Sequence, residues 1–331
     1  MPNMYQLARV AALVAIFWLP GPSASAQSEA EPQPLPNPYR ADQSWSAQLP
    51  EGRTWGAPGG LATDRNGNLW VFERCGANTC AGSSTAAILE FDPSGKLLKS
   101  FGAGMFVFPH GIFVDRENNV WVTDADGKDG KGHQVVKFSP DGKVLLTLGK
   151  AGMAGDGPDT FNRPSGVVVA PNGDIFVADG HGGDSNTRIV KFSKDGKFVK
   201  AWGTKGTGPG EFGELHSIAM DSKERIFVAD RGNNRIQIFD KDGNFIAQWT
   251  QFGRPSGLYI DSKDNLYVAD NTGVTGGIRI GSAREGSVSG FVPDADSDPK
   301  RGADEDVAVD SQDNLYVAET PRRSVKKFVK K

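Results

Sequence analysis

The segment His110–Asp124 reads HGIFVDRENNVWVTD, and five other segments of the chain repeat its pattern. The six copies begin at Gly59, His110, Ser165, His216, Ser256 and Glu305. Each copy has an apolar strand, a turn rich in Asp, Asn and Gly, and a second apolar strand such as NVWVTD. These turn residues tolerate the positive φ of tight hairpins. Self-similarity every roughly 40–55 residues is typical of propellers and solenoids.

Two further strands complete most of the units. A third strand, such as QVVKFS (134–139), leads through a turn such as Asp141–Gly142 to a fourth, such as KVLLTLG (143–149). The second strands are apolar at nearly every position, which indicates burial on both faces. Four antiparallel strands per unit, six units and no helical periodicity predict an all-β fold, a six-bladed β-propeller.

The two ends of the repeat array are irregular. The sixth unit stops after its third strand, SVKKFVKK (324–331), and we expect QSWSAQLPEG (43–52) to supply the missing strand. The ring would then close between the two ends of the chain, leaving no open strand edge. In the fifth unit, a long stretch rich in Gly and Asp (Gly273–Gly302) takes the place of regular third and fourth strands.

The N-terminal segment has the features of an export signal. Arg9 precedes the apolar run Val10–Leu19, and Ala24–Ser25–Ala26 offers a cleavage site before Gln27. We therefore expect residues 1–26 to be a signal peptide, since the apolar run is too short to span a membrane. Residues 27–43, rich in Pro and Glu, are expected to form a disordered leader, and 44–331 the propeller domain. This organisation predicts a secreted or periplasmic protein.

Charge and cysteine content narrow the function further. The formal net charge of the 331-residue chain is −3, without blocks of Lys and Arg, which argues against nucleic acid as a partner. Cys75 and Cys80 are the two cysteines. In an oxidising compartment they are expected to form a disulfide; a metal site is the alternative, but thiolate sites usually need four ligands.

At one position of the repeat, the residue type alternates from each copy to the next. The second, fourth and sixth copies carry His110, His216 and Glu305 there, and the other copies carry Gly or Ser. In a closed ring, alternate blades face the axis from three sides, so these side chains would meet around a common divalent metal ion. The alternative is that they are ordinary polar residues at the mouth of a channel.

Several segments resemble known families. The pattern P-x-G-x-x-x-D-x-x-x-N-x-x-V-x-D and the segment NNRIQIF are similar to NHL repeats, a class of β-propeller module. FPHGIFVDRENNVWVTD, RIVKFSKDGKFVKAWG and GEFGELHSIAMD more closely resemble the peptidyl-α-hydroxyglycine α-amidating lyases. That resemblance implies a six-bladed propeller that cleaves an α-hydroxyglycine amide into a peptide amide and glyoxylate. It also implies a zinc ion held by three histidines on the channel axis, and a calcium ion lower in the channel.

The resemblance assigns the metal ligands. It places two zinc ligands on His110 and His216, and the third on Glu305, where the family has histidine. Two imidazoles with a carboxylate also bind zinc and leave a position open. The added negative charge admits manganese, iron or calcium as other occupants. The structural calcium would be held by the carboxylate of Asp306 and by the main-chain carbonyls of Leu61 and Ile112.

The resemblance also assigns catalytic residues. The family's arginines fall on Arg74 and Arg231, and its tyrosine base falls on His181, whose neutral imidazole would replace the phenol. Alternatively, the arginines pair only with acids at the blade edges, and His181 is simply exposed. The acids that end the second strands are expected to accept main-chain N–H groups; they are Asp124, Asp179, Asp230 and Asp270.

Three functions remain open. The first is a secreted metal-dependent lyase that acts on a small-molecule or peptide α-hydroxy amide. The second is a non-catalytic NHL module that binds a protein or glycan on one face. The third is a metal-dependent hydrolase similar to the lactonase propellers. Because one fold hosts many chemistries, metal content and glyoxylate release would distinguish them.

Overall fold

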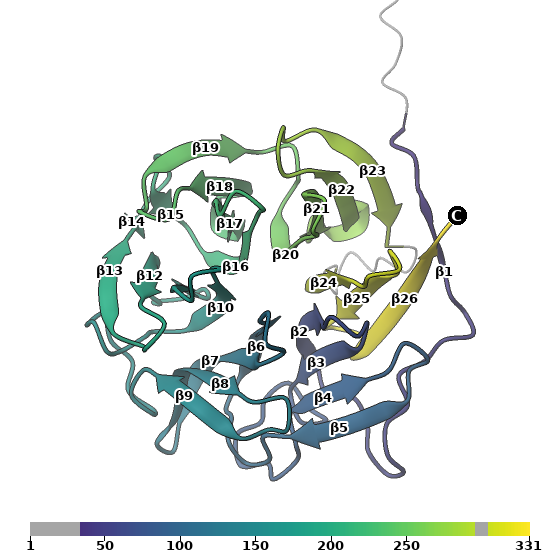
Figure 1. Ribbon diagram of the computed structural model, residues 1–331, viewed down its shortest axis with the longest axis horizontal. Coiled ribbons are helices and arrows are strands. Elements are labelled where there is room, and N and C mark those ends of the chain that lie inside the picture. Colours follow the sequence, from purple (N-terminus) through teal and green to yellow (C-terminus); the bar gives the residue numbers. More distant parts are fainter. Residues whose placement is uncertain (1–33, 295–303) are drawn as a thin grey trace, which may run out of the picture. The chain divides into compact units, whose positions relative to one another are not determined.

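The computed structural model describes residues 34–294 and 304–331. The expected signal peptide and the first residues of the expected leader lie outside the described residues. The chain divides into two units, Met1–Pro34 and Leu35–Lys331, and the second unit is a ring of four-stranded antiparallel sheets (Figure 1). Six such sheets are found in the described part of the chain, so the predicted all-β, six-bladed fold is confirmed.

In blades one to five the strands follow chain order from the axis outwards, and in blade six β1 is the outermost strand. Blade one consists of β2 (Pro58–Thr63), β3 (Leu69–Glu73), β4 (Ile88–Phe91) and β5 (Leu97–Phe101). Blade two consists of β6 (Pro109–Val114), β7 (Val120–Lys128), β8 (Lys131–Phe138) and β9 (Val144–Leu148). Blade three consists of β10 (Pro164–Val169), β11 (Ile175–Asp179), β12 (Arg188–Phe192) and β13 (Phe198–Trp202).

Blade four consists of β16 (Leu215–Met220), β17 (Ile226–Asp230), β18 (Arg235–Phe239) and β19 (Phe245–Trp249). Blade five consists of β20 (Pro255–Ile260), β21 (Asn265–Asp270), β22 (Gly277–Ser282) and β23 (Val288–Pro293). Blade six consists of β24 (Asp306–Val309), β25 (Leu315–Glu319), β26 (Ser324–Lys330) and β1 (Tyr39–Ala41). A short parallel pair, β14 (Thr204–Lys205) and β15 (Glu211–Phe212), and two single-turn 3-10 helices, η1 (Arg231–Asn233) and η2 (Gly273–Thr275), complete the described elements.

The N-terminal strand closes the ring, but it is not the segment that the sequence suggested. β1 pairs antiparallel with β26, with Tyr39 opposite Lys330, and the two strands lie side by side in Figure 1. The expected segment 43–52 makes only one parallel bridge, Gln48 to Lys96 of blade one. The buried ring of Tyr39 packs into the apolar cluster of blades five and six. This contact favours β1 over segment 43–52 as the closing strand. The closing strand therefore lies within the segment expected as a leader.

Blade five is regular, so the prediction that a Gly-rich stretch replaces its outer strands is wrong. β22 pairs with β21 on one side and with β23 on the other. The glycines are needed because the backbone is crowded there. A Cβ on Gly281 would lie 2.1 Å from the carbonyl oxygen of Ser287 and 3.0 Å from the ring of Phe252. Gly281 is therefore needed because the neighbouring backbone leaves no room for a side chain.

Aspartate side chains fix the turn between the first and second strands of a blade. In blade two, the Asp115 carboxylate accepts the main-chain N–H of Glu117 and of Asn119, and also the indole N–H of Trp121. Asn118 occupies the left-handed region at φ 61°. An aspartate that bonds the backbone ahead of it stabilises a tight turn, so the repeated D-x-x-x-N pattern sets the register of the hairpin.

Apolar side chains fill the space between neighbouring blades. β3, β11, β17 and β25 are buried at every position, which confirms the prediction for the second strands. The innermost strands approach one another closely: a Cβ on Gly60 would lie 2.5 Å from the His110 carbonyl oxygen, and one on Gly111 would lie 2.6 Å from that of Ser165. This packing holds the first residues of the inner strands close to the axis of the ring.

No helix in the described residues is long and apolar enough to cross a membrane.

Candidate metal centre

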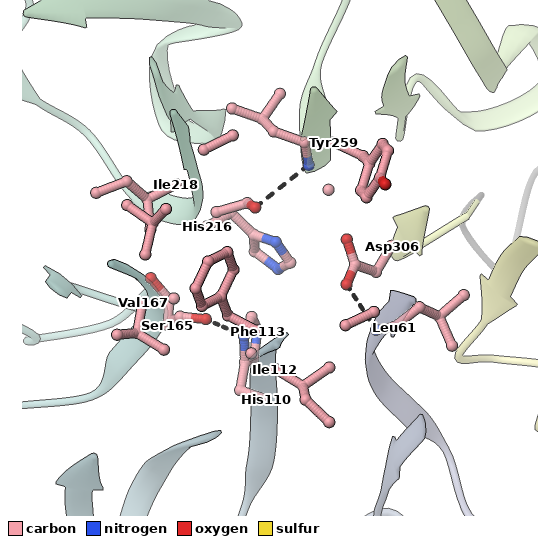
Figure 2. Close-up of a pocket in the computed structure, with 18 of the residues that line it drawn as sticks. Leu61, His110, Ile112, Phe113, Ser165, Val167, His216, Ile218, Tyr259 and Asp306 are labelled. Carbon is pink, nitrogen blue, oxygen red and sulfur yellow. Dashed lines mark hydrogen bonds between the residues drawn. The ribbon is translucent and has the colours of Figure 1, made fainter. Parts of the chain in front are cut away.

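The structure brings His110, His216 and Glu305 together at one end of the channel. His110 lies on β6, His216 on β16, and Glu305 directly precedes β24. Nε2 of His216 is 3.4 Å from Oε1 of Glu305, and Nε2 of His110 is 3.8 Å from the same oxygen. The two rings are 2% exposed and lie near the centre of the ring of strands in Figure 2. Alternate blades thus supply two imidazoles and one carboxylate.

Each imidazole is oriented by the blade that follows it. Nδ1–H of His110 donates to the Ser165 carbonyl oxygen at 2.8 Å, and Nδ1–H of His216 donates to that of Ser256 at 3.2 Å. The first of these bonds is dashed in Figure 2. Nε2 of each ring is left buried, and it has no hydrogen-bond partner among the described residues. A histidine held through one nitrogen, with the other free, has the arrangement of a metal ligand.

His181 joins the same cluster from a loop after β11. Its ring centroid lies 4.3 Å from that of His110 and 5.1 Å from that of His216, and the ring also contacts Phe108 at 5.9 Å. The four side chains His110, His181, His216 and Glu305 each offer one ligand atom, and these atoms all lie within 4.8 Å of one another. His181 is only partly buried, so it forms the outer side of the cluster.

The electrostatics of the cluster keep every member in its metal-binding protonation state. Burial lowers the pKa of His110 well below its usual value, and the neighbouring His181 and His216 lower it further. Burial, together with the charge of Arg231, lowers the pKa of His216. Burial of His181, together with the charges of His216 and Arg231, lowers the pKa of His181 to about 3. Burial alone would raise the pKa of Glu305, but His216 in its protonated form and the permanent charge of Arg231 lower it well below its usual range. The imidazoles are therefore neutral and the carboxylate is ionised near neutral pH.

Two arginines flank the cluster. Arg231 Nη1 lies 3.8 Å from Oε2 of Glu305, and its guanidinium also donates to Glu214 at 2.6 Å and to the Ser256 hydroxyl at 3.2 Å. Arg74 is buried, with its guanidinium carbon 3.8 Å above the Phe108 ring and its Nε donating to the Pro109 carbonyl oxygen at 3.0 Å. Among the described residues, Arg231 pairs with Glu214 at the entry to blade four, whereas Arg74 bonds a carbonyl oxygen and the Asn78 side chain. Both the substrate-binding role and the structural role of these arginines stay predictions.

Two site residues were missed at the sequence level. Glu214 holds the Arg231 guanidinium through both carboxylate oxygens, and the Phe108 ring contacts both Arg74 and His181. Glu214 is two residues before His216 and Phe108 two residues before His110. Their common offset from the register position was the signal that could have identified them.

A disulfide lies beside the site. Cys75 and Cys80 are joined, with their Cα atoms 5.1 Å apart. Cys80 N–H and the Thr79 hydroxyl both donate to the Val107 carbonyl oxygen at 2.8 Å. The loop that begins at Arg74 is therefore attached to the segment that carries Phe108 and leads into β6.

The residues expected to hold calcium lie deeper in the same channel. Asp306, Leu61 and Ile112 line a cavity of about 210 Å³ that also includes His110, His216 and Glu305, and all three are labelled in Figure 2. Oδ2 of Asp306 accepts the Leu61 N–H at 2.8 Å. Burial raises the pKa of Asp306 to about 7, as expected for a carboxylate without a cationic partner among the described residues.

The acids that end the second strands are structural, as the sequence predicted. Asp124 accepts the main-chain N–H groups of Val107 and Phe108 at 2.9 and 2.5 Å. Asp179, Asp230 and Asp270 accept those of Asn162, Gly213 and Arg254 at 2.8 Å each. Asp179, Asp230 and Asp270 are the last residues of their strands, whereas β7 continues past Asp124 to Lys128. In these four blades the bonds attach the segment that enters the blade to its second strand. His133 is on β8 and outside the cluster, where its Nδ1 accepts the Arg163 N–H at 3.3 Å.

Comparisons with known proteins agree with the fold and with the resemblance found in the sequence. Residues 160–228 match a family model described as a 6-bladed beta-propeller. NHL repeat-containing protein 3 of Homo sapiens is 36% identical over 203 residues, which are 60% of this chain and 55% of that protein. Peptidyl-alpha-hydroxyglycine alpha-amidating lyase 1 of Drosophila melanogaster is 33% identical in an alignment 229 residues long, which covers 60% of this chain and 40% of that protein. The matches thus span about half or less of these relatives.

A gluconolactonase from Xanthomonas campestris, XC5397, has a similar solved structure. Its TM-score is 0.60 at 14% identity, and the match covers 90% of this chain and 99% of that one. At this identity the likeness concerns the fold alone. The chain is a six-bladed β-propeller with homologues among the amidating lyases and the NHL repeat proteins.

Proposed function

We propose that the chain is a secreted, metal-dependent lyase that cleaves an α-hydroxy amide into an amide and an aldehyde of the glyoxylate type. One observation carries the proposal: the buried Nε2 atoms of His110 and His216, which have no hydrogen-bond partner among the described residues, lie within 3.8 Å of one carboxylate oxygen of Glu305. The similarity to an amidating lyase over 60% of the chain supports the choice of reaction. The disulfide Cys75–Cys80 is consistent with an oxidising compartment.

The donor set fits a divalent cation. His110 and His216 would bind it through Nε2 and Glu305 through its carboxylate, a combination that suits zinc and also harder divalent ions. Bound there, the cation would act as a Lewis acid that lowers the pKa of the substrate hydroxyl. The positive charge of Arg231, 3.8 Å from Glu305, moderates the extra negative charge that distinguishes this site from three histidines.

The side chains around the cation have separate tasks. Glu214 fixes the plane of the Arg231 guanidinium, and Phe108 supports that of Arg74. Both arginines would stabilise negative charge on a substrate carboxylate or carbonyl oxygen. In the reaction, the hydroxyl oxygen loses its proton and forms the carbonyl. The carbon–nitrogen bond breaks with its electrons passing to nitrogen, which takes up a proton. His181 is proposed as the proton acceptor, through a ring nitrogen that binds no metal ion.

The deeper site is proposed to hold a structural calcium ion. The Asp306 carboxylate and the carbonyl oxygens of Leu61 and Ile112 are hard oxygen donors, which calcium prefers. A cation there would neutralise a buried carboxylate whose pKa is otherwise raised to about 7.

Metal analysis and product detection test the proposal. The purified protein should contain about one transition-metal ion or zinc per chain, and it should release glyoxylate from a peptidyl α-hydroxyglycine. The Glu305→Ala variant should lose both properties. Metal with cleavage of lactones but no glyoxylate would identify a hydrolase instead. Protein that binds no divalent metal would contradict the proposal and favour a binding module.

A further inference from the structure

His181 occupies a position that the alternating register does not explain. It comes from blade three, whose register residue is Ser165, and it reaches the axis from the loop after β11. Its ring nevertheless lies as close to His110 as His216 does, with centroid distances of 4.3 and 4.7 Å. The cluster thus contains a third imidazole in addition to the one carboxylate.

The loop that carries His181 is fixed by backbone hydrogen bonds on two sides. The N–H groups of Gly180 and His181 both donate to the Arg163 carbonyl oxygen, at 3.0 and 2.9 Å. The Gly180 carbonyl oxygen accepts the N–H of Leu215, the residue before His216, at 3.0 Å. Gly180 has no room for a side chain, since a Cβ would lie 2.2 Å from the Asn186 carbonyl oxygen. His181 is therefore tied to the strand that carries His216.

The four side chains lie nearly close enough together to share a single cation. Their ligand atoms lie within 4.8 Å of one another, and atoms about 2.1 Å from a shared metal ion are at most about 4.2 Å apart. The ligand atoms would therefore have to move slightly towards a common centre. We propose that His181 is a fourth protein ligand, so that the cation is held by three imidazoles and one carboxylate. This inference rests on the proposed function only in that the channel site holds a divalent metal.

Four protein ligands change which metal supports catalysis. A tetrahedral zinc ion would have no position left for substrate. A metal that accepts five or six ligands keeps one or two positions open, and sites rich in imidazole suit iron, copper and nickel as well as zinc. A ring nitrogen bound to the metal cannot accept a proton at the same time. The inference therefore removes that nitrogen of His181 from the role of general base.

Zinc binding without substrate tests the inference directly. The zinc dissociation constant is measured by competition with a chromogenic chelator for the full chain and for His181→Ala, with His181→Gln as a second variant that keeps side-chain volume. Asp184→Ala is the matched control, because Asp184 is on the same loop with an exposed side chain. X-ray absorption of the zinc-loaded proteins counts the bound imidazoles.

The expected result is three imidazoles in the full chain and two in both His181 variants. Their dissociation constants should rise at least about tenfold, while Asp184→Ala changes less than about twofold. Two imidazoles in the full chain, with unchanged affinity in the variants, would overturn the inference, and so would a full chain that binds no zinc. Three imidazoles in a protein that releases no glyoxylate would support the ligand role and refute only the lyase function.

Discussion

At the scale of single residues, Ser256 shows how much the site depends on groups that bind no metal. Its carbonyl oxygen accepts Nδ1–H of His216, and its hydroxyl lies 3.2 Å from that nitrogen, 3.2 Å from Arg231 Nη1 and 3.5 Å from Oε2 of Glu305. The hydroxyl therefore links one ligand, one arginine and the carboxylate. Ser165 has the same register position in blade three, but its hydroxyl donates to the Ala178 carbonyl oxygen.

These two serines form a matched pair for mutation. Ser256→Ala is expected to weaken zinc binding about tenfold, because partners that orient the ligands typically contribute 10- to 100-fold. Ser165→Ala keeps the main-chain bond to His110 and should leave zinc binding within about twofold. Chelator competition measures both constants. Equal effects of the two changes would show that the Ser256 hydroxyl has no part in orienting the ligands.

Asp124 makes stability depend on pH in an unusual direction. Burial raises the pKa of Asp124 to about 7, above the value of about 3.9 in an unfolded chain. The folded state therefore binds more protons than the unfolded state between these values. The stability contributed by Asp124 is complete below about pH 4 and is lost as the pH rises through about 7, by at most about 1.4 kcal/mol per pH unit.

Asp124→Asn provides the comparison for this prediction. Asparagine keeps one oxygen to accept an N–H of Val107 or Phe108 but does not titrate. The difference in unfolding free energy between the full chain and this variant should shrink as the pH rises from 4 to 7, measured by urea denaturation. A difference that is constant over this range would mean that Asp124 is ionised throughout.

At the scale of elements, the closing strand β1 depends on one aromatic ring. Tyr39 is 2% exposed and packs against the apolar cluster between blades five and six. Tyr39→Ala should lower the unfolding free energy by about 3–5 kcal/mol, the usual range for deleting a buried aromatic side chain. Tyr39→Phe keeps the ring and should cost much less. Denaturant unfolding tests both; a small loss for Tyr39→Ala would imply that β1 adds little to blade six.

Elements also show what the sequence could and could not predict. The inner and second strands were identified because Asp115 and its equivalents bond the turn ahead of them, a local effect visible in a repeat. The same register placed His110, His216 and Glu305 on one axis. The family resemblance assigned His181 to the site as a base, but its closeness to the other two imidazoles depends on the Arg163 and Leu215 backbone. The choice of β1 depends on a distant apolar cluster. Contacts between distant segments leave no periodic signal.

At the scale of the whole propeller unit, the ring is held closed by its own two ends. β26 pairs with β25 on one side and with β1 on the other. A chain that begins at Asp42 would leave β26 as an open edge, and open edges recruit other strands. Such a chain is expected to self-associate in sedimentation experiments, and a peptide of residues 35–43 added in excess should restore the monomeric fraction seen with the full chain. A truncated chain that sediments as the full chain does would contradict this account of closure.

The pairing of a ligand on one blade with a supporting carbonyl on the next has an evolutionary corollary. Blade three supports His110 through the Ser165 carbonyl, and blade five supports His216 through the Ser256 carbonyl. A descendant that lost blade three or blade five would therefore lose the group that orients one of the two imidazoles. Retention of the centre thus constrains blades that need not supply a ligand themselves.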